Sequence, residues 1–325
     1  MAQPTNTFDT YAVKGIREDL QDKSYMVSPE KTPVLSAGRR FKAEAKYHEW
    51  QRDTLATPNK DNAVPEGDDR TGTALTPTVR VGNTMQLFDK VAVVSSSVRA
   101  SATAGRSDEM KYQIATKAIP EIKRDLEAMM LSKNPSVAGN STTARKSGGL
   151  GVMIYSTALH NGAGATTAHT SGAPTTAQTA GTNRAFTETL IKTAMQSIFT
   201  NSGEMPTMLS MTPSHKSTFS SFTGIAVNRV TLKKGGQQAA VIGGADIYVS
   251  DFGELSVVPN YIQATANPNV VYILNPDYYG VAYLQPLVTQ PLAKTGHSEK
   301  EMVSFEACAV VTSETAQGKI DDLIA

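Results

Sequence analysis

The chain has 325 residues, 40% of them hydrophobic, which is enough to bury a sizeable core, but only 6% are aromatic. We therefore expect part of its stability to come from neighbouring subunits. The 31 basic and 30 acidic residues give a net charge of +1, which excludes a strong overall attraction to nucleic acid. There is no apolar run long enough to span a membrane and no signal-peptide pattern, so we expect a protein that stays in the cytoplasm until it assembles.

The first 45 residues show no sustained hydrophobic periodicity and carry a basic group at Arg39, Arg40 and Lys42. A segment with so little apolar content does not pack on its own. We expect an extended arm that becomes ordered on another surface, with a short helix over 11–20. A frayed terminus is the alternative.

Two strand-like runs flank a long polar segment. The run KYHEWQRD at 46–53 alternates around His48 and Trp50, and a second strand-like run covers 78–98. Between them lie about two dozen residues rich in proline, glycine and acids, with no core-forming pattern. This segment is too long for a tight turn, so a projecting hairpin is predicted.

A helix over 107–133 is the strongest predicted element. Ser107 and Asp108 are capping candidates. Apolar residues then recur every four positions, at Ile114, Ala118, Ile122, Leu126 and Met130. At about 1.5 Å per residue the helix forms a rod of about 40 Å. Pro120 lacks an N–H and clashes with the preceding turn, which predicts a kink near 116–120.

The rest of the chain alternates loops, one helix and strands. Residues 156–183 are a low-complexity stretch of Ala, Thr, Gly and Ser, for which we expect an exposed loop or a short β excursion. A second helix is predicted over 187–201, with Gly203 as its stop. Strands are predicted at 207–211, 239–252, 255–260, 270–275, 281–286 and 301–312, the last with one apolar face. The expected class is mixed α+β, and the long helix argues against a jelly roll.

Catalytic and metal-binding motifs are absent from the sequence. GNSTTARKS ends in Lys-Ser, but Arg145 stands where a phosphate-binding loop requires glycine. The five histidines lack metal-ligand spacing. Cys308 lies in an apolar stretch where a buried, inert thiol is expected. We therefore expect no enzymatic activity, no cofactor and no metal site.

Acidic and basic side chains cluster at separate places. Glu66, Asp68 and Asp69 lie at the hairpin tip. Asp68 and Asp69 occupy a Gly-flanked flexible segment without an apolar pocket, so a solvated or interface cluster is the better interpretation than a cation site. For the basic groups at 39–42 and 233–234 there are two interpretations. In one, they contact nucleic acid or the acidic residues of a neighbouring subunit; in the other, they are charged side chains in solvated loops.

Several stretches resemble the major capsid proteins of tailed bacteriophages. They cover nearly the whole chain and read NTFDTYAVKGIREDL, HEWQRDTLA, EGDDRTG, VAGNSTTARKSGGL, FTGIA, GADIYVSDFGELSVVPN, LAKTGHSEK and AQGKI. The order of the predicted elements is also similar to the Hong Kong 97-type phage capsid fold, an α+β fold.

This resemblance implies five parts. They are an N-terminal arm at 1–45, an extended E-loop hairpin at 46–98, a P-domain with the spine helix at 99–150, an A-domain at 151–290 and a return into the P-domain at 291–325. The stretch at 156–183 is longer than the family pattern, and Pro120 is unusual in a spine helix. There is no heptad run before Phe8, so a separate scaffolding protein is expected.

The implied function is structural. The subunit is expected to assemble as hexamers and pentamers into the icosahedral or prolate head of the virion, around double-stranded DNA that it contacts weakly, with a portal and, optionally, decoration proteins. We expect the subunit interfaces to use Arg39, Arg40, His48, Trp50, Glu66, Asp68, Asp69, Lys123 and Arg124. Two alternatives stay open: an encapsulin-like compartment shell, and a hydrolase or binding module whose site is assembled from distant residues.

Overall fold

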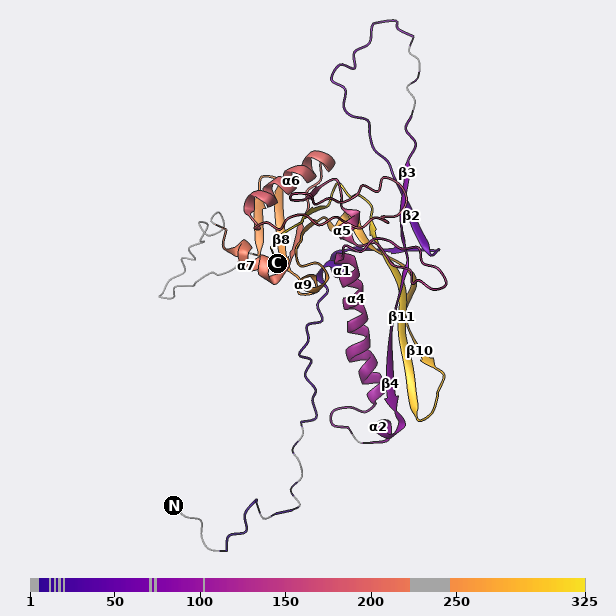
Figure 1. The fold of residues 1–325 in the computed structure, drawn as a ribbon, viewed down its shortest axis with the longest axis vertical. Helices are drawn as coiled ribbons and strands as arrows, with labels where there is room; N and C mark the ends of the chain where they lie inside the picture. Colours follow the sequence, from indigo (N-terminus) through magenta and orange to yellow (C-terminus); the bar gives the residue numbers. More distant parts are fainter. Residues whose placement is uncertain are drawn as a thin grey trace, which may run out of the picture.

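The computed structural model describes residues 6–11, 13–14, 16, 19, 21–69, 72, 75–101, 103–222 and 246–324. Two sheets and a long helix form the body, and two extended segments leave it, one toward the N-terminus and one as a long loop between β2 and β3 (Figure 1).

The helices and strands have the following bounds. The first half of the chain contains α1 (Pro33–Ala37), β1 (Arg39–Lys42), β2 (Tyr47–Arg52), β3 (Val79–Thr84), β4 (Gln86–Ser95), α2 (Ser96–Ala100), α3 (Glu109–Tyr112), the π-helical η1 (Gln113–Ala118), α4 (Ile119–Leu131) and α5 (Leu150–Met153). The second half contains β5 (Ala158–Leu159), α6 (Glu188–Ser202), β6 (Met208–Met211), α7 (Pro213–Ser220), β7 (Ile247–Ser250), β8 (Gly253–Pro259), α9 (Gln263–Ala266), β9 (Val271–Leu274), the 3₁₀ turn η2 (Pro276–Tyr278), β10 (Tyr279–Leu292), β11 (Ser298–Val311) and β12 (Gly318–Ile320).

The predicted rod is present as a helical run from α3 through η1 to α4. Asp108 caps it by accepting a hydrogen bond from the backbone N–H of Met110, at 2.9 Å. Near 116–120, where a kink is predicted, the helix contains the π-helical segment η1, directly before Pro120. A wider turn moves the preceding carbonyl away from the proline ring, so the helical path continues through Pro120.

The long helix packs against a four-stranded sheet of order β1-β10-β11-β4. The rings of Phe88 and Phe305 stack at 4.9 Å within this core. The apolar face predicted for 301–312 is confirmed, because its alternating residues from Val303 to Val311 are all buried. The residues between them from 306 to 310 are buried as well. β11 lies between two other strands, with the α4 helix on one face and Met85 with Trp50 on the other, so both of its faces are covered.

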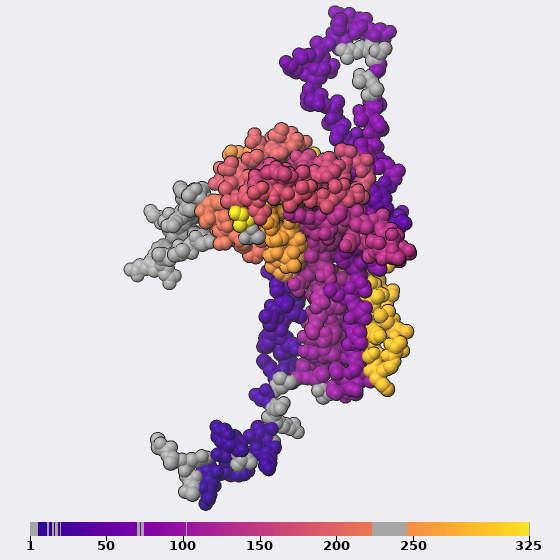
Figure 2. All heavy atoms as spheres, in the orientation of Figure 1, coloured from indigo at the N-terminus to yellow at the C-terminus, as the bar shows by residue number. Residues whose placement is uncertain are grey.

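The predicted projecting hairpin is present. β2 and β3 pair antiparallel from Tyr47 with Thr84 to Arg52 with Val79. The connecting residues 53–78 are called the projecting loop below, and those of them that the structure describes stand clear of the body in both views (Figures 1 and 2). Polar composition therefore located this element correctly.

A second sheet has six strands in the order β5-β12-β9-β6-β8-β7. The α6 helix covers it and ends at Gly203, whose φ of 71° is the left-handed geometry that favours glycine. The predicted helix over 187–201 and the buried strand at 207–211 are confirmed. Only β7 lies within the predicted strand 239–252, of which residues 239–245 fall outside the described residues.

Short elements at both ends of the chain were not predicted. In the arm, β1 pairs in parallel with β10, and α1 buries Val34 completely against the long helix. The helix predicted over 11–20 falls partly outside the described residues, and the residues described there are not helical. β12 was also missed, although it lies between β5 and β9.

Candidate assembly surfaces and a buried polar cluster

A buried amide, that of Asn83, anchors the inner end of the hairpin to the body. The Asn83 carboxamide on β3 donates hydrogen bonds to the carbonyl of Ala309 at 2.8 Å and to Ser147 Oγ at 2.9 Å, and it accepts one from the backbone N–H of Gly148 at 2.8 Å. Its side chain is fully buried. The hairpin therefore leaves the body from a fixed point.

His48 and Trp50, predicted as interface residues, lie on β2 at this root. Their rings are 5.9 Å apart and both residues are half-buried. Trp50 packs against two core clusters of its own chain. Beside them, Arg52 donates to the carbonyl of Val311 at 2.9 Å. At least Trp50 is thus committed to packing within the subunit.

The predicted acidic tip is exposed. Glu66, Asp68 and Asp69 all lie on the surface of the projecting loop, around a turn in which the N–H of Asp68 bonds the carbonyl of Pro65 at 3.3 Å. Among the described residues, these three acids form no ion pair within the subunit. Their charge is therefore free for a partner.

The four predicted basic partners are distributed over two elements. Arg39 and Arg40 lie on β1, where Arg39 already pairs with Asp277 at 2.7 Å. Lys123 and Arg124 lie on α4, where Lys123 is exposed and Arg124 stacks over the Tyr261 ring at 5.5 Å. The described part of the chain brings none of them to the acidic tip, so such contacts require a second copy.

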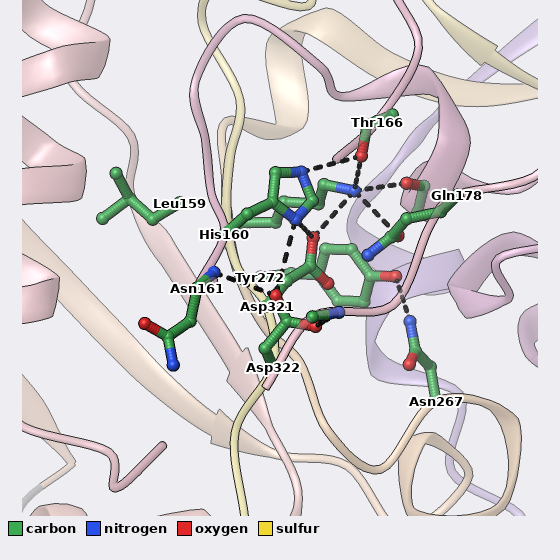
Figure 3. Close-up of polar contacts among 12 residues, drawn as sticks. Leu159, His160, Asn161, Thr166, Gln178, Asn267, Tyr272, Asp321 and Asp322 are labelled. Atoms are coloured by element: carbon green, nitrogen blue, oxygen red, sulfur yellow. Dashed lines mark hydrogen bonds and ion pairs between the residues drawn. The ribbon is translucent and has the colours of Figure 1, made fainter. Parts of the chain in front are cut away.

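A polar cluster that the sequence did not predict lies beside β12, the strand next to the β5 edge of the six-stranded sheet (Figure 3). Lys319 on β12 is fully buried. Its ammonium group contacts the Asp321 carboxylate at 2.9 Å, Thr166 Oγ1 at 2.7 Å, Gln178 Oε1 at 3.0 Å and the carbonyl of Gly151. Burial lowers the pKa of Lys319, and the Asp321 charge opposes this shift.

His160 extends the cluster. Its Nε2 lies 3.0 Å from Thr166 Oγ1, and its Nδ1 lies 3.4 Å from the Asp321 carboxylate. Burial lowers the pKa of His160, and the charge of Lys319 adds to this effect while the two neighbouring aspartates oppose it. The ring therefore serves as a neutral hydrogen-bonding group near neutral pH.

Asp322 joins the cluster to the segment at 160–183, which we call the strap. The chain turns at Asp322 with a φ of 60°, and its carboxylate accepts hydrogen bonds from the N–H groups of Asn161 at 3.0 Å and Gly181 at 2.8 Å. Burial opposes ionisation of Asp322, but these two donors hold its pKa below the ordinary value.

The expectation of an exposed loop at 156–183 is therefore wrong in part. β5 is the short β excursion, but the strap beyond it wraps the buried cluster, and Pro174 and His169 are themselves buried. The small residues of this stretch allow close packing, and its low-complexity composition alone does not indicate this.

The chemistry of the cluster is structural. Lys319 is enclosed by its acceptors, so it presents no nucleophile to solvent. Among the described residues, no group of three or more His, Cys, Asp or Glu side chains is arranged to hold a metal ion, and no helix is long and apolar enough to cross a membrane. Cys308 is buried as predicted, and burial raises the pKa of its thiol to about 12.

A family model described as SU10 major capsid protein matches residues 3–323 of the chain. A curated protein from Escherichia phage Phieco32, described as a major capsid protein, is 35% identical over 132 residues. The match covers 41% of this chain and 37% of that protein, so the chain spans little more than a third of this relative's length.

Solved structures share the fold. The capsid of a native GTA particle has a TM-score of 0.62 at 10% identity, covering 97% of this chain and 98% of that one. The structure from Gordonia phage Cozz has a TM-score of 0.60 at 8% identity, covering 99% of this chain and 97% of that one. The SrpI encapsulin of Synechococcus elongatus PCC 7942 has a TM-score of 0.57 at 12% identity, covering 98% of this chain and 96% of that one. The α+β, Hong Kong 97-type fold is thereby confirmed.

Proposed function

Because the chain belongs to the SU10 major capsid protein family, we propose that it is the shell-building subunit of a tailed-phage head, icosahedral or prolate, that encloses double-stranded DNA. The match over residues 3–323 supports this proposal, as does the shared fold of phage capsids. The role is structural and requires no catalysis or cofactor. The subunit is located in the host cytoplasm before assembly and in the virion afterwards.

The observation that carries the proposal is the projecting loop. Leu55 is 99% exposed and Leu75 is 95% exposed, so neither side chain is packed by its own subunit. Burying a leucine contributes about 1.5–3 kcal/mol, which a monomer forgoes at both positions. A shell in which each loop lies on a neighbouring copy recovers this energy at every subunit.

The finer organisation follows from the same features. We propose hexamers and pentamers, with the acidic tip of one copy meeting Arg39, Arg40, Lys123 or Arg124 of the next. A separate scaffolding protein and a portal complete the head, and decoration proteins are optional. The net charge of +1 favours weak contact with the packaged DNA.

We also propose the five-part division into an arm at 1–45, an E-loop at 46–98, a P-domain at 99–150, an A-domain at 151–290 and a return at 291–325. The last boundary falls within β10, which is continuous from Tyr279 to Leu292. In this division β10 begins in the A-domain and pairs along its length with β11, which lies in the return.

The alternative is an encapsulin-like compartment shell. The SrpI encapsulin supports it through the fold alone, at 12% identity. The family model favours the phage head over this alternative. The cargo separates the two functions, because a phage head accepts DNA through a portal whereas a compartment encloses a protein.

The test is a loop deletion. Removing residues 57–73 is expected to leave a soluble subunit that does not close shells, as seen by electron microscopy of the purified protein with its scaffolding protein. A variant with the same segment replaced by an equally long Gly/Ser linker separates loop length from loop chemistry. Normal particles from the deletion would contradict the proposal.

A further inference from the structure

We infer that Asp322 is a positioning residue for assembly: it closes the neck of the strap, and the strap tip in turn fixes the direction in which the hairpin leaves the body. This inference rests on the proposed function, in which the projecting loop reaches a neighbouring copy. It concerns residues outside every surface considered for assembly above.

The neck of the strap is closed by one carboxylate. Asn161 and Gly181 stand at opposite ends of the strap, yet both donate their backbone N–H to Asp322. A Cβ on Gly181 would lie 2.6 Å from the Asp322 carboxylate, and a Cβ on Gly164 would contact the same oxygen. Glycine at both positions thus lets the two sides of the strap, which we call its limbs, close around Asp322.

The limbs are held together a second time, just beyond the neck. Ala165 and Thr179 exchange two backbone hydrogen bonds, of 3.1 and 2.9 Å. The Lys319 ammonium reaches Thr166 on one limb and Gln178 on the other (Figure 3). The strap is therefore a loop with a pinned neck and not a flexible linker.

The tip of the strap lies on β3, at the outer part of the hairpin root. The N–H of Gly172 donates to the carbonyl of Arg80 at 3.0 Å, and the N–H of Gly82 donates to the carbonyl of Gly172 at 2.9 Å. Pro174 fixes the same tip to the body by accepting a bond from the N–H of Ser136 at 2.7 Å.

These contacts divide the root into two zones. The side chain of Asn83 holds the inner zone through Ser147, Gly148 and Ala309, none of which belongs to the strap. Beyond it, Gly82 is the β3 residue whose N–H bonds to the strap. Loss of the Asp322 carboxylate leaves the two sides of the strap joined only by the Ala165–Thr179 bonds and by Lys319, which loosens the strap tip on Gly82 while Asn83 stays in place. The outer pairs of the hairpin then tilt, and the projecting loop changes direction.

The experiment uses the full chain with Asp322→Gly. Glycine accepts the left-handed φ at this position, so the variant removes the carboxylate without adding backbone strain. Amide hydrogen exchange of the soluble subunit is expected to rise about tenfold at Asn161 and Gly181, and also at Gly82 and Gly172. Exchange at Gly148, whose N–H bonds to Asn83, is expected to stay unchanged.

Two further variants make the result specific. Asp322→Asn keeps one acceptor oxygen and is expected to show the same pattern with a smaller rise. Asp246→Ala removes an exposed carboxylate that pairs with Lys216 at 3.1 Å, outside the strap, and is expected to leave all four amides unchanged. If Asp322→Gly fails to fold, the graded effect of Asp322→Asn carries the test.

Assembly provides the second measurement. Asp322→Gly subunits are expected to form particles with a broader range of diameters than the wild type, whereas Asp246→Ala particles keep the wild-type range. Faster exchange at the neck with wild-type exchange at Gly82 and Gly172 would overturn the inference. Failure of the wild-type chain to form shells would instead overturn the proposed function, because the exchange result does not depend on particles.

Discussion

The carboxylate of Glu127, fully buried on the spine helix, accepts a hydrogen bond from the backbone N–H of Val34, 3.4 Å away in the N-terminal segment. Leu35 and the Asn260 amide donate to the same group. One side chain thus joins the arm, the spine helix and the segment after β8. Burial raises the pKa of Glu127 to about 7, although these three donors oppose the shift.

The first prediction concerns pH. Because the folded pKa lies above the unfolded value of about 4.5, the native state binds more protons between these values, and Glu127 stabilises the fold less as pH rises. Relative to Glu127→Gln, the free energy of unfolding of the wild type should fall by about 2 kcal/mol between pH 5 and 8. Urea unfolding at several pH values measures this.

Glu121→Gln is the matched control, because Glu121 lies on the same helix but is exposed. The free energy of unfolding of this variant should change with pH as that of the wild type does. Parallel curves for wild type and Glu127→Gln would show that the buried carboxylate does not titrate in this range.

The second prediction concerns the acidic tip. Reversing Asp68 and Asp69 to Lys should slow or abolish shell formation without lowering the melting temperature of the free subunit, because both side chains are exposed and form no ion pair in the described chain. Each exposed pair contributes only about 0–1 kcal/mol, but repetition around a shell multiplies the effect. Light scattering at increasing salt follows assembly.

A double reversal of Asp246 and Asp251 to Lys provides the control, since it changes the net charge equally at the far edge of the other sheet. Unchanged yield and salt dependence for the tip variant would refute the electrostatic contact.

The third prediction concerns Pro120. In Pro120→Ala the new N–H can bond the carbonyl of Thr116, so the π-helical segment η1 should convert to regular α-helix. The side chains before residue 119 then rotate about the helix axis, and particle size or curvature should change. Cryo-electron microscopy of the particles reports both effects, with Lys117→Ala as a control that keeps the proline. Persistence of η1 in the variant would show that another contact causes it.

The fourth prediction concerns the hairpin anchor. Asn83→Leu should lower the free energy of unfolding by about 3–5 kcal/mol, because the carbonyl of Ala309 and the N–H of Gly148 lose their buried partner. Chemical denaturation measures the loss. Asn140→Ala, in an exposed turn, should cost far less, and a similar loss in both variants would argue against Asn83 as the anchor.

Local periodicity explains what the sequence predicted well. The spine helix and α6 carry apolar residues at helical spacing with recognisable caps, Asp108 at one start and Gly203 at the other stop. The projecting loop was recognisable because 53–78 contains no core-forming pattern. Each of these signals lies within the element that it describes, so one stretch of sequence is enough.

Partners distant in the chain explain what was missed. The basic strand β1 is read locally as a solvated arm, and only its pairing with Gly280–Tyr283 makes it part of a sheet. Lys319 on β12 and Asp321, directly after the strand ends, are two residues apart, and this spacing was the available signal for a buried ion pair. Nothing near them in sequence indicates that Thr166 and Gln178 complete their shell.

The position of β12 has a consequence for how the subunit is made. The ribosome releases this strand after both of its neighbours, β5 and β9, so β5 has no partner strand in the sheet until β12 emerges. Before that moment Asp322 is also missing, so the two ends of the strap at 160–183 have no carboxylate to hold them together. A chain that stops short of Gly318 should therefore stay sensitive to protease across 160–183 and be left out of particles. We therefore expect the late pairing of β12 to exclude truncated subunits from particles.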